Sequence, residues 1–462
     1  MEKSIQIERE IADQIINQIG IVTIRETETV LIYDNGVYKD NNTAMSRIRE
    51  LITDISESKM VLIGDTIKPY NLTISKKNQI IEFVKTSTFR SIDDFDSQPN
   101  RINVKNGHLI RTKGKTVFLK HFEYNENPYL SRIQIPINYD PDAENLEIDQ
   151  IFEDIFGFET LPLIYEMMGY LLLPHTKYSK AFMLYGDTGT GKTTAINIIS
   201  RFVGHNNISG IELQVLDDKF ELEKTRNKLI NIFDDLSNKP IEYVGNFKKL
   251  VTNTFLFGRI KFLQNEIRWK NRCKGLFACN ILPTIKQYIS DAFYSRWVLI
   301  PCFSDLIKNP TLREKKFSEK EMSGLLNKVL EALDRLELRG GFPDQWQDLD
   351  YVKNRWNLDV NPVALFVEEC CEKGESNEVD YNQFFEQVNI FRQERKANEI
   401  SKTIMTKSLK KLGIERKDKG SKGEKRERFV FSGIQFTYDF IMDHLELQTE
   451  NPVTINNFIN GD

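Results

Sequence analysis

The chain has 462 residues and a formal net charge of −4 at pH 7; 40% of its residues are hydrophobic and 28% are charged. This length fits roughly two to four domains with sizeable cores. The charge balance excludes a chain that is basic throughout, so any nucleic-acid surface must be local. The five cysteines form no CxxC pair, which favours reduced thiols over a disulfide framework. No apolar run reaches the ~18–20 residues that cross a bilayer, so we expect a cytoplasmic protein, in its own cell or in a host cell, with no membrane partner.

Residues 1–147 mix helical and strand patterns, which predicts a mixed α/β region. Residues 34–38 place an Asn-Gly-containing turn between apolar runs, and this predicts a β-hairpin. A helix is expected at residues 75–88, with Ser75 as its N-cap. Strands are expected at residues 102–107, 116–122 and 132–137.

The rest of the chain divides into four segments. Residues 148–178 are strongly apolar at helical spacing until Pro174, which predicts a helical collar segment. Strand-like and helix-like runs alternate over residues 179–345, as an α/β sheet requires. A compact last module is expected at residues 361–440, followed by a tail at residues 441–462.

A glycine-rich stretch at residues 186–193 is the strongest motif. It fits the pattern G-x-x-x-x-G-K-[ST], follows a strand-like apolar run and precedes a segment of helical spacing. Glycines let the backbone wrap phosphates, and the start of the helix adds free N–H donors. We expect Lys192 to reach the β- and γ-phosphates and the Thr193 hydroxyl to hold Mg²⁺. The nucleotide-binding residues predicted by this motif are Gly186, Asp187, Thr188, Gly189, Thr190, Gly191, Lys192, Thr193 and Thr194.

Polar residues adjoin three further apolar strands downstream of this motif. Asp234 and Asp235 end one strand; one acid would hold Mg²⁺ and the other would orient the attacking water. We assign Asp234 to the metal and Asp235 to the water, although their order stays open. Asn280 ends the next buried strand and is a candidate sensor of the γ-phosphate, or a plain turn residue before a proline. Arg296 heads a later strand and is a candidate arginine finger for a neighbouring subunit, or a member of a surface ion pair.

Two basic stretches are candidate DNA contacts. Residues 257–272 alternate basic with aromatic or aliphatic side chains around a central turn, which predicts a hairpin that contacts phosphates and bases. A helix at residues 402–412, a basic loop and a strand at residues 429–431 predict a winged helix with its wing at residues 418–425. In both stretches, a merely solvated basic face is the alternative. The predicted DNA-binding residues are Arg259, Lys261, Arg268, Trp269, Lys270, Lys419, Lys422 and Lys425.

These motifs in this order resemble the superfamily 3 helicases, and most closely the helicase part of phage, plasmid and poxvirus-type primase-helicases. The glycine-rich stretch, Phe233-Asp234-Asp235, the basic hairpin and Cys279-Asn280-Ile-Leu-Pro283 look like that family's Walker A, Walker B, B′ and C motifs. Upstream, Asn103-Val-Lys-Asn-Gly107 looks like the family's N-terminal helicase-associated segment. The module from Pro362 is similar to the family's winged-helix domain.

The resemblance implies an AAA+ ring, usually a homohexamer, that uses ATP and Mg²⁺ to move along single-stranded DNA, normally 3′ to 5′, and to open forked DNA. The expected fold is therefore an α/β P-loop (AAA+) core with a mixed α/β N-terminal region, a helical collar and a C-terminal winged-helix domain. Members often carry two adjacent arginines where this chain has Ser295-Arg296, so the finger assignment rests on Arg296. Many members also carry a primase domain. We see no acidic primase triad before the glycine-rich stretch, so a separate primase or polymerase is an expected partner.

The leading functional hypothesis is an ATP-dependent replicative DNA helicase of a mobile element such as a phage, plasmid or virus. The alternative is a DNA-binding replication initiator or loader that uses ATP as an assembly switch and does not unwind DNA. A P-loop kinase or a DNA-packaging motor is more remote, because the chain has a hairpin and a sensor strand where a kinase would have lid arginines.

Overall fold

The computed structural model describes residues 2–40, 43–63, 66–112, 115–121, 129–237, 239–260, 266–285, 290–302, 315–360, 363–394, 399–418, 429–438 and 440–441. The chain forms two compact units; the first contains residues 1–280 and 285–347, and the second contains residues 281–284 and 348–462. Both units are mixed α/β, and the largest sheet is parallel. Within the described ranges, no helix combines the length and the apolar character that crossing a membrane requires.

The first unit begins with three helices and a small sheet. Apolar side chains of the helices form one core with strand residues such as Ile21 and Val30. The helices are α1 (Glu2–Gln18), α2 (Thr43–Ser58) and α3 (Ile74–Ser87). The sheet has the order β3-β2-β1-β6, with β1 (Ile21–Ile24), β2 (Thr29–Asp34), β3 (Val37–Lys39) and β6 (Phe89–Arg90). A separate two-stranded ribbon contains β4 (Met60–Ile63) and β5 (Thr66–Pro69).

Two local predictions in this region have different outcomes. The hairpin turn is confirmed: Asn35 and Gly36 connect β2 to β3 with φ angles of 48° and 91°, the left-handed conformation that a two-residue hairpin loop needs. The predicted cap of α3 is wrong. Thr73, not Ser75, is the N-cap, and its hydroxyl accepts a hydrogen bond from the Lys76 N–H at 3.3 Å.

A three-stranded antiparallel sheet follows, with the order β7 (Arg101–Val104), β8 (Gly107–Thr112) and β9 (Lys115–Lys120). The strand predicted at residues 132–137 is wrong. This segment makes only an isolated bridge between Val104 and Ile135. Its backbone groups form hydrogen bonds with side chains instead. The Asn103 amide donates to the Ile133 carbonyl at 3.0 Å, and the Arg132 N–H donates to the Asp96 carboxylate at 3.0 Å.

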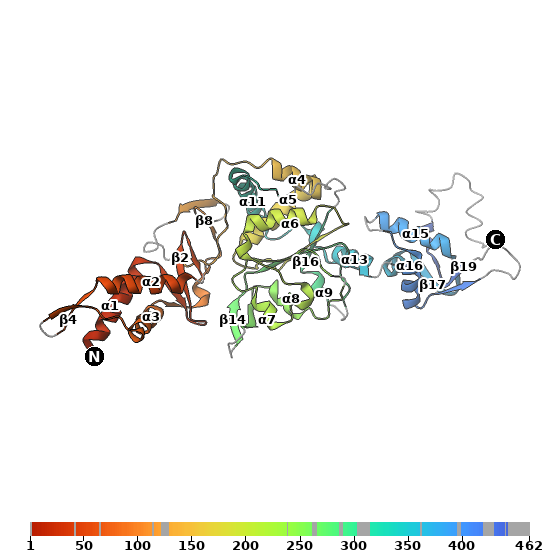
Figure 1. Ribbon diagram of the computed structural model, residues 1–462. Coiled ribbons are helices and arrows are strands. Elements are labelled where there is room, and N and C mark those ends of the chain that lie inside the picture. The colour runs from red at the N-terminus through yellow and green to blue at the C-terminus, as the bar shows by residue number, and fades with distance from the viewer. Residues whose placement is uncertain are drawn as a thin grey trace. The chain divides into compact units, whose positions relative to one another are not determined.

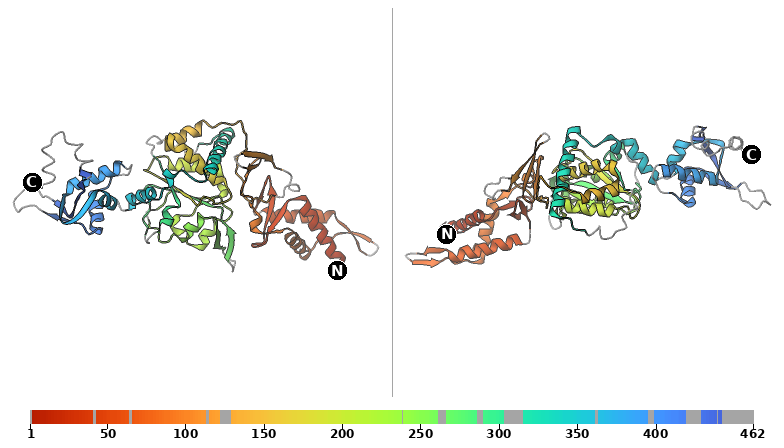
Figure 2. Two further views of the ribbon diagram at one scale, coloured as in Figure 1. Left: turned by 180° about the vertical axis from the view of Figure 1, so that it is seen from behind. Right: turned by 90° about the horizontal axis from the view of Figure 1, so that it is seen from above.

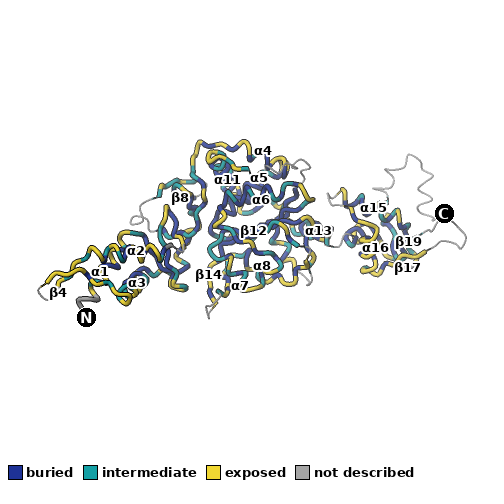
Figure 3. Tube along the Cα trace, in the orientation of Figure 1, coloured by how far each residue is buried: buried dark blue, intermediate teal, exposed yellow. Residues whose placement is uncertain are grey.

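A five-stranded parallel sheet with the order β11-β12-β15-β10-β16 forms the centre of the first unit. The edge strand at one end of this order is short, and the other four strands are almost entirely buried, as expected when helices cover both faces (Figure 3). The strands are β10 (Ala181–Tyr185), β11 (Ile208–Ser209), β12 (Ile230–Phe233), β15 (Lys274–Cys279) and β16 (Trp297–Pro301).

Helices lie on both faces of this sheet (Figure 1). On one face are α4 (Glu147–Phe156), α5 (Leu161–Leu172), α6 (Lys192–Val203) and α11 (Glu319–Arg339). On the other face are α7 (Lys219–Glu223), α8 (Gly245–Leu250) and α9 (Asp291–Tyr294). The view from behind shows the same layers (Figure 2). The short helix α12 (Asp344–Gln347) ends the unit.

The helical pattern predicted from residue 148 up to Pro174 is present as two helices. The chain forms α4 and α5, because Gly157 adopts a φ of 77° and ends α4. Both helices share one hydrophobic core with β10, α6 and α11. Gly169 of α5 lies so close to α11 that an added Cβ would be 2.8 Å from Leu333 Cβ. The segment predicted as a collar is therefore packed into the core of the parallel sheet.

The hairpin predicted between the second and third motif strands is present. It contains β13 (Phe255–Arg259) and β14 (Glu266–Lys270), which pair antiparallel with Phe257 opposite Arg268. Exposed and buried residues alternate strictly along both strands. The hairpin therefore has one face against the unit and one face in solvent.

The second unit is a helical layer with a three-stranded antiparallel sheet of order β17-β19-β18. Phe366, Phe384 and Phe431 are fully buried in its core. The module begins earlier than residue 361, since α13 belongs to it and the Trp356 indole donates to the Pro283 carbonyl at 3.0 Å. Beyond residue 441 the predicted tail lies outside the described residues. The elements are α13 (Leu349–Val360), α14 (Ala364–Cys370), β17 (Cys371–Asp380), α15 (Tyr381–Glu394), α16 (Lys402–Lys411), β18 (Glu415–Asp418) and β19 (Phe429–Phe436).

Candidate functional site

The glycine-rich loop connects the buried strand β10 to helix α6. Gly186, Gly189 and Gly191 have φ angles of 149°, 94° and 86°, which side-chain-bearing residues rarely adopt. At Gly186 there is also no room, because an added Cβ would be 2.4 Å from the Cys302 carbonyl oxygen. The loop therefore has a backbone course that only these glycines permit, and it ends at the N-terminus of α6, where N–H groups are free to bind an anion.

Lys192 is the first residue of α6 and is held inside the loop. Its ammonium group donates to the carbonyls of Gly186 and Asp187, each at 2.7 Å. The side chain is only 8% exposed, and this burial lowers its pKa, against the opposing influence of nearby acids. The Lys192 ammonium group therefore lies where an anion bound by the loop would contact it.

The two acids and the asparagine predicted from the sequence lie at the same edge of the sheet as the loop. β15 lies between β12 and β10 and is parallel to both, so the carboxyl ends of the three strands are neighbours. Asp234 and Asp235 follow β12, and Asn280 follows β15. The Asn280 amide donates to the Thr188 hydroxyl at 3.2 Å, which joins the third strand to the loop.

These residues line one hollow of about 300 Å³. Its lining is Thr188, Gly189, Gly191, Lys192, Thr193, Thr194, Asp234, Asp235 and Asn280. Thus the structure brings together the loop, the acid pair and the amide that the sequence predicted as separate motifs. Gly186, Asp187 and Thr190 are loop residues that do not line the hollow themselves.

The chemistry of this hollow suits a phosphate group together with a hard divalent cation. A helix N-terminus and a lysine attract phosphate, while carboxylate and hydroxyl oxygens are ligands that Mg²⁺ accepts. Asp234 and Thr193 could hold such an ion. Among the described residues, no group of three or more His, Cys, Asp or Glu side chains could hold a metal. A Mg²⁺ ion held by these two side chains would complete its coordination with water or phosphate oxygens.

Arg296 lies at the side of the sheet where the parallel strands begin, opposite the carboxyl ends that carry the hollow. It precedes β16, whose first residue Trp297 pairs with Ala181 at the start of β10, whereas the glycine loop follows the end of β10. Its guanidinium donates to the Ala292 carbonyl, and burial lowers its pKa. Within one chain, Arg296 is therefore not part of the hollow.

Of the predicted DNA contacts on the hairpin, Trp269 must be corrected. It is 2% exposed, and it packs beneath Gly258, where an added Cβ would be 2.9 Å from the indole ring. Arg259, Arg268 and Lys270 are on the solvent face as expected. Lys261 lies outside the described residues, as do Lys419, Lys422 and Lys425 of the predicted wing.

The solvent face of the hairpin carries two aromatic side chains that the sequence analysis missed. Phe255 and Phe257 are 40% and 49% exposed. The Arg268 guanidinium lies 4.4 Å from the centre of the Phe255 ring, a cation–π contact. The signal was available, because Phe255, Phe257 and Arg259 alternate along one strand and so share one face.

The base of the hairpin is anchored by Arg272, a residue without a predicted role. This side chain is buried, and it donates to the carbonyls of Phe95 at 2.6 Å and Asp96 at 3.3 Å. At the far end of β14, Glu266 accepts from Lys219 at 2.6 Å, and that ammonium group lowers the pKa of the carboxyl. Both ends of β14 are thus joined by side-chain bonds to other segments of the first unit.

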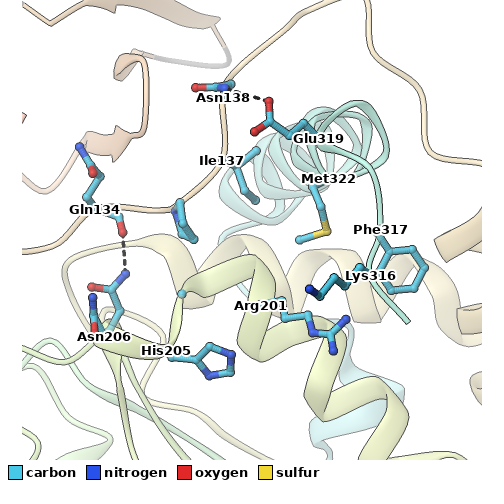
Figure 4. A pocket seen from close by; sticks show the side chains of 13 residues that line it. Gln134, Ile137, Asn138, Arg201, His205, Asn206, Lys316, Phe317, Glu319 and Met322 are labelled. Carbon is cyan, nitrogen blue, oxygen red and sulfur yellow. Dashed lines mark hydrogen bonds between the residues drawn. The ribbon is translucent and has the colours of Figure 1, made fainter. Parts of the chain in front are cut away.

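A second and larger hollow of about 600 Å³ lies elsewhere in the first unit (Figure 4). It is bordered by residues 134–138, the end of α6 and the start of α11. Arg201, His205 and Lys316 lie around it beside the apolar Phe317 and Met322 (Figure 4). None of the predicted nucleotide-binding residues lines it, so the site is identified by its chemistry and not by its size.

Two protein-family models match parts of this chain. Residues 12–157 match the sequence model of a family described as D5 N terminal like, and residues 184–294 match a family of unknown function, DUF5906. Both families occur in phage and viral primase-helicase proteins, and each match covers less than half of this chain. The second match begins in β10 and contains the glycine loop, both acids and Asn280.

Individual similarities are weaker. The AAA-ATPase At3g28570, mitochondrial, of Arabidopsis thaliana is 29% identical over 106 residues, which is 22% of this chain and 22% of that protein. The chain thus spans about a fifth of the length of this curated relative. Among solved structures, the A form apo structure of the NrS-1 C terminal region matches with 15% identity and a TM-score of 0.43, covering 92% of this chain and 98% of that chain. A second apo structure of that region matches with 14% identity and a TM-score of 0.44 over the same shares.

Proposed function

We propose that the chain is an ATP-dependent replicative DNA helicase of the superfamily 3 type, which hydrolyses ATP in the hollow at the carboxyl edge of its parallel sheet. The observation that carries the proposal is the convergence of the glycine loop, Lys192, the acid pair and Asn280 around that hollow. Its supports are the position of the DUF5906 match over the same residues and the short similarity to a protein named as an AAA-ATPase.

In this proposal the loop acts as a P-loop. The N–H groups at the start of α6 and the Lys192 ammonium group bind the β- and γ-phosphates, and Lys192 exchanges its two loop carbonyls for phosphate oxygens. Thr193 and Asp234 hold the Mg²⁺ that neutralises the phosphates. Asp235 orients or deprotonates the attacking water, and Asn280 contacts the γ-phosphate or that water.

DNA is the proposed polymer, and a homohexameric ring is the proposed assembly. Arg296 lies at the opposite sheet edge, so it could act as a finger only on the nucleotide of a neighbouring copy. The hairpin offers exposed arginine, lysine and phenylalanine side chains to a single strand. The second unit is proposed as the winged helix that contacts DNA beside the motor, and a separate primase or polymerase as a further partner.

The proposal is tested by ATP hydrolysis with and without single-stranded DNA. The parent is expected to hydrolyse Mg-ATP faster when DNA is added, while Lys192→Ala is expected to lose at least about 100-fold in rate, since charge stabilisation at the phosphates is lost. Lys180→Ala is a matched control, because Lys180 is another partly buried lysine of the same unit whose ammonium group donates to the Ser295 carbonyl. Hydrolysis by Lys192→Ala at the parent rate would contradict the proposal.

The initiator hypothesis makes a different prediction for the same preparation. It expects ATP-dependent assembly on DNA without strand separation. Hydrolysis that is coupled to assembly but never opens a fork would replace the helicase proposal by the initiator. Translocation polarity is measured by strand displacement on duplexes that carry a single-stranded tail at only the 3′ or only the 5′ end. The family resemblance implies 3′ to 5′.

A further inference from the structure

The second hollow of the first unit, of about 600 Å³, shares no lining residue with the hollow beside the glycine loop and lies in the size range of small-molecule sites. Residues 134–138, the end of α6 and the start of α11 border it. α6 begins with Lys192 at the glycine loop, and Arg201 lies in its last turn. At about 1.5 Å per residue, these two residues are about 14 Å apart along the helix axis. A ligand in the second hollow would therefore not occupy the glycine loop.

Hydrogen bonds join the three walls of the second hollow (Figure 4). The Asn207 amide donates to the Gln134 carbonyl at 2.8 Å and to the Val203 carbonyl, at the end of α6, at 2.7 Å. The Asn138 amide donates to the Glu319 carboxylate, at the start of α11, at 3.4 Å. The hollow is therefore formed before a ligand binds, and this lowers the entropic cost of binding.

Two cations of the second hollow, Arg201 and Lys316, have no acidic partner among the described residues. The Arg201 guanidinium donates to the carbonyl of Lys315, which directly precedes Lys316, so its charged end lies beside the backbone that carries the second cation. This bond uses one of the five guanidinium N–H donors and leaves the others for a ligand. The Glu319 carboxylate on the same hollow is already paired, since the Lys105 ammonium group lies 3.4 Å from it. The hollow therefore offers an anion two cations that lack a counter-charge.

The remaining lining is largely apolar. Ile137 is buried, whereas Phe317 and Met322 pack on the main core and keep part of their surface exposed. The Met322 side chain points from α11 toward Lys316 (Figure 4). A partly exposed aromatic ring can stack on a planar ring, and a flexible thioether adapts to the edge of such a ring. The lining therefore suits a ligand that has both a planar apolar part and an anionic part.

We infer that the second hollow binds a free nucleotide, with the phosphate on Arg201 and Lys316 and the base against Phe317. A guanidinium binds two phosphate oxygens at once, and an ammonium group adds a compact charge. The exposed side chains of His205 and Asn206 on the same hollow can form hydrogen bonds with the ribose hydroxyls or the base. The inference goes beyond the proposed function, because binding here needs neither ATP hydrolysis nor any residue of the glycine loop.

The test is isothermal titration calorimetry of the full-length chain with each of the four common ribonucleoside 5′-monophosphates, at up to about 1 mM. At least one should bind saturably, and it should bind equally well to Lys192→Ala. Replacing Arg201 and Lys316 together by glutamine should weaken this binding at least tenfold, because both charged phosphate contacts are lost. Phe317→Leu keeps an apolar side chain without the planar ring and should weaken it by at least about fivefold, because stacking is lost.

The matched control replaces Lys68 and Lys115, two exposed lysines outside the hollow, by glutamine. This variant has the same net charge as the double variant of the hollow and should bind like the parent. The matching nucleoside and inorganic phosphate test the two parts of the ligand, and each should bind at least tenfold more weakly than the nucleotide.

Three results would overturn the inference. The first is the absence of saturable binding by any of the monophosphates. The second is unchanged affinity in both the double glutamine variant and Phe317→Leu. The third is a loss confined to Lys192→Ala, which would place the nucleotide in the glycine loop. Parent chain that binds the monophosphate in the second hollow but hydrolyses no ATP would refute the proposed function and leave this site standing.

Discussion

The side-chain amide of Asn280 donates to the hydroxyl of Thr188 at 3.2 Å. Asn280 follows the third motif strand and Thr188 lies in the glycine loop, so this bond connects two motifs that are 92 residues apart in the chain. Both residues line the hollow that the acid pair also lines. Any ligand that fills this hollow must therefore lie beside both side chains.

We predict that Asn280→Ala slows ATP hydrolysis by about 10²–10³-fold, the usual effect of removing one donor that stabilises the transition state. The KM for ATP should change little, because the loop and Lys192 supply most of the ground-state contacts. Steady-state kinetics measures both values. Thr188→Ala is the control, since it removes the bond to Asn280 and leaves the amide in place. An equal loss in both variants would mean that Asn280 acts only by holding the loop.

Gly186→Ala is expected to destabilise the first unit by about 1–3 kcal/mol, because the residue has a φ of 149° and an added Cβ would be 2.4 Å from the Cys302 carbonyl. Urea unfolding measures this change. Gly210→Ala is the matched control, since the nearest atom to its added Cβ is 3.8 Å away. Equal stability of the two variants would contradict the close packing at Gly186.

Lys274 predicts a pH dependence of stability. The side chain is fully buried, and this desolvation lowers its pKa to about 7, while the unfolded chain keeps an ordinary lysine pKa. Between pH 7 and about 10, the unfolded state then holds one more proton than the folded state, so stability rises with pH, by at most about 1.4 kcal/mol per unit.

The measurement compares urea unfolding of the parent and of Lys274→Met between pH 7 and 9. The parent should gain stability with pH more steeply than the variant, which lacks this titrating group. Lys180 also has a pKa lowered by burial, to about 8, and adds the same slope to both proteins. Identical pH slopes would show that the folded chain keeps Lys274 protonated.

Phe257→Ala is expected to weaken binding of single-stranded DNA by about 1–3 kcal/mol, the usual value of stacking one base on an aromatic ring. Anisotropy with a labelled single strand measures it. Phe158→Ala is a suitable control, because Phe158 is 75% exposed but lies outside the hairpin.

Trp269→Ala should affect stability in place of a direct DNA contact. It should unfold the hairpin region, since a large buried ring is lost.

The position of Arg296 predicts complementation between two inactive variants. Arg296→Ala and Lys192→Ala should each abolish hydrolysis alone if the finger acts on a neighbouring copy. Mixed rings would contain sites with an intact loop on one copy and an intact Arg296 on the next. Random mixing in equal amounts should restore about a quarter of the sites. Failure of mixed rings to hydrolyse ATP would confine Arg296 to a role within its own chain.

The arrangement of the hollow followed from the sequence because parallel strands place their carboxyl ends at one edge. Asp234, Asp235 and Asn280 each end an apolar strand downstream of the loop, so their proximity could be predicted without coordinates. Arg296 precedes its strand, which by the same rule assigns it to the opposite edge. Which functions these residues perform is a matter of chemistry and stays a prediction.

Other features depended on side-chain direction or on distant partners. Trp269 was grouped with Arg268 and Lys270, although neighbours in a strand point to opposite faces. The break between α4 and α5 depended on the φ angle of one glycine, Gly157. The segment at residues 132–137 has strand-like composition, but Asn103 and Asp96 take its backbone bonds. Such tertiary bonds override local pattern.

Strand displacement on a forked duplex with Mg-ATP tests the central claim most directly. The account predicts that the parent separates the strands, that Lys192→Ala does not, and that the control variant Lys180→Ala does. It further predicts that no displacement occurs with a nonhydrolysable ATP analogue. Displacement by Lys192→Ala at the parent rate would contradict the account, because the hollow at the sheet edge would then not be the source of the energy for unwinding.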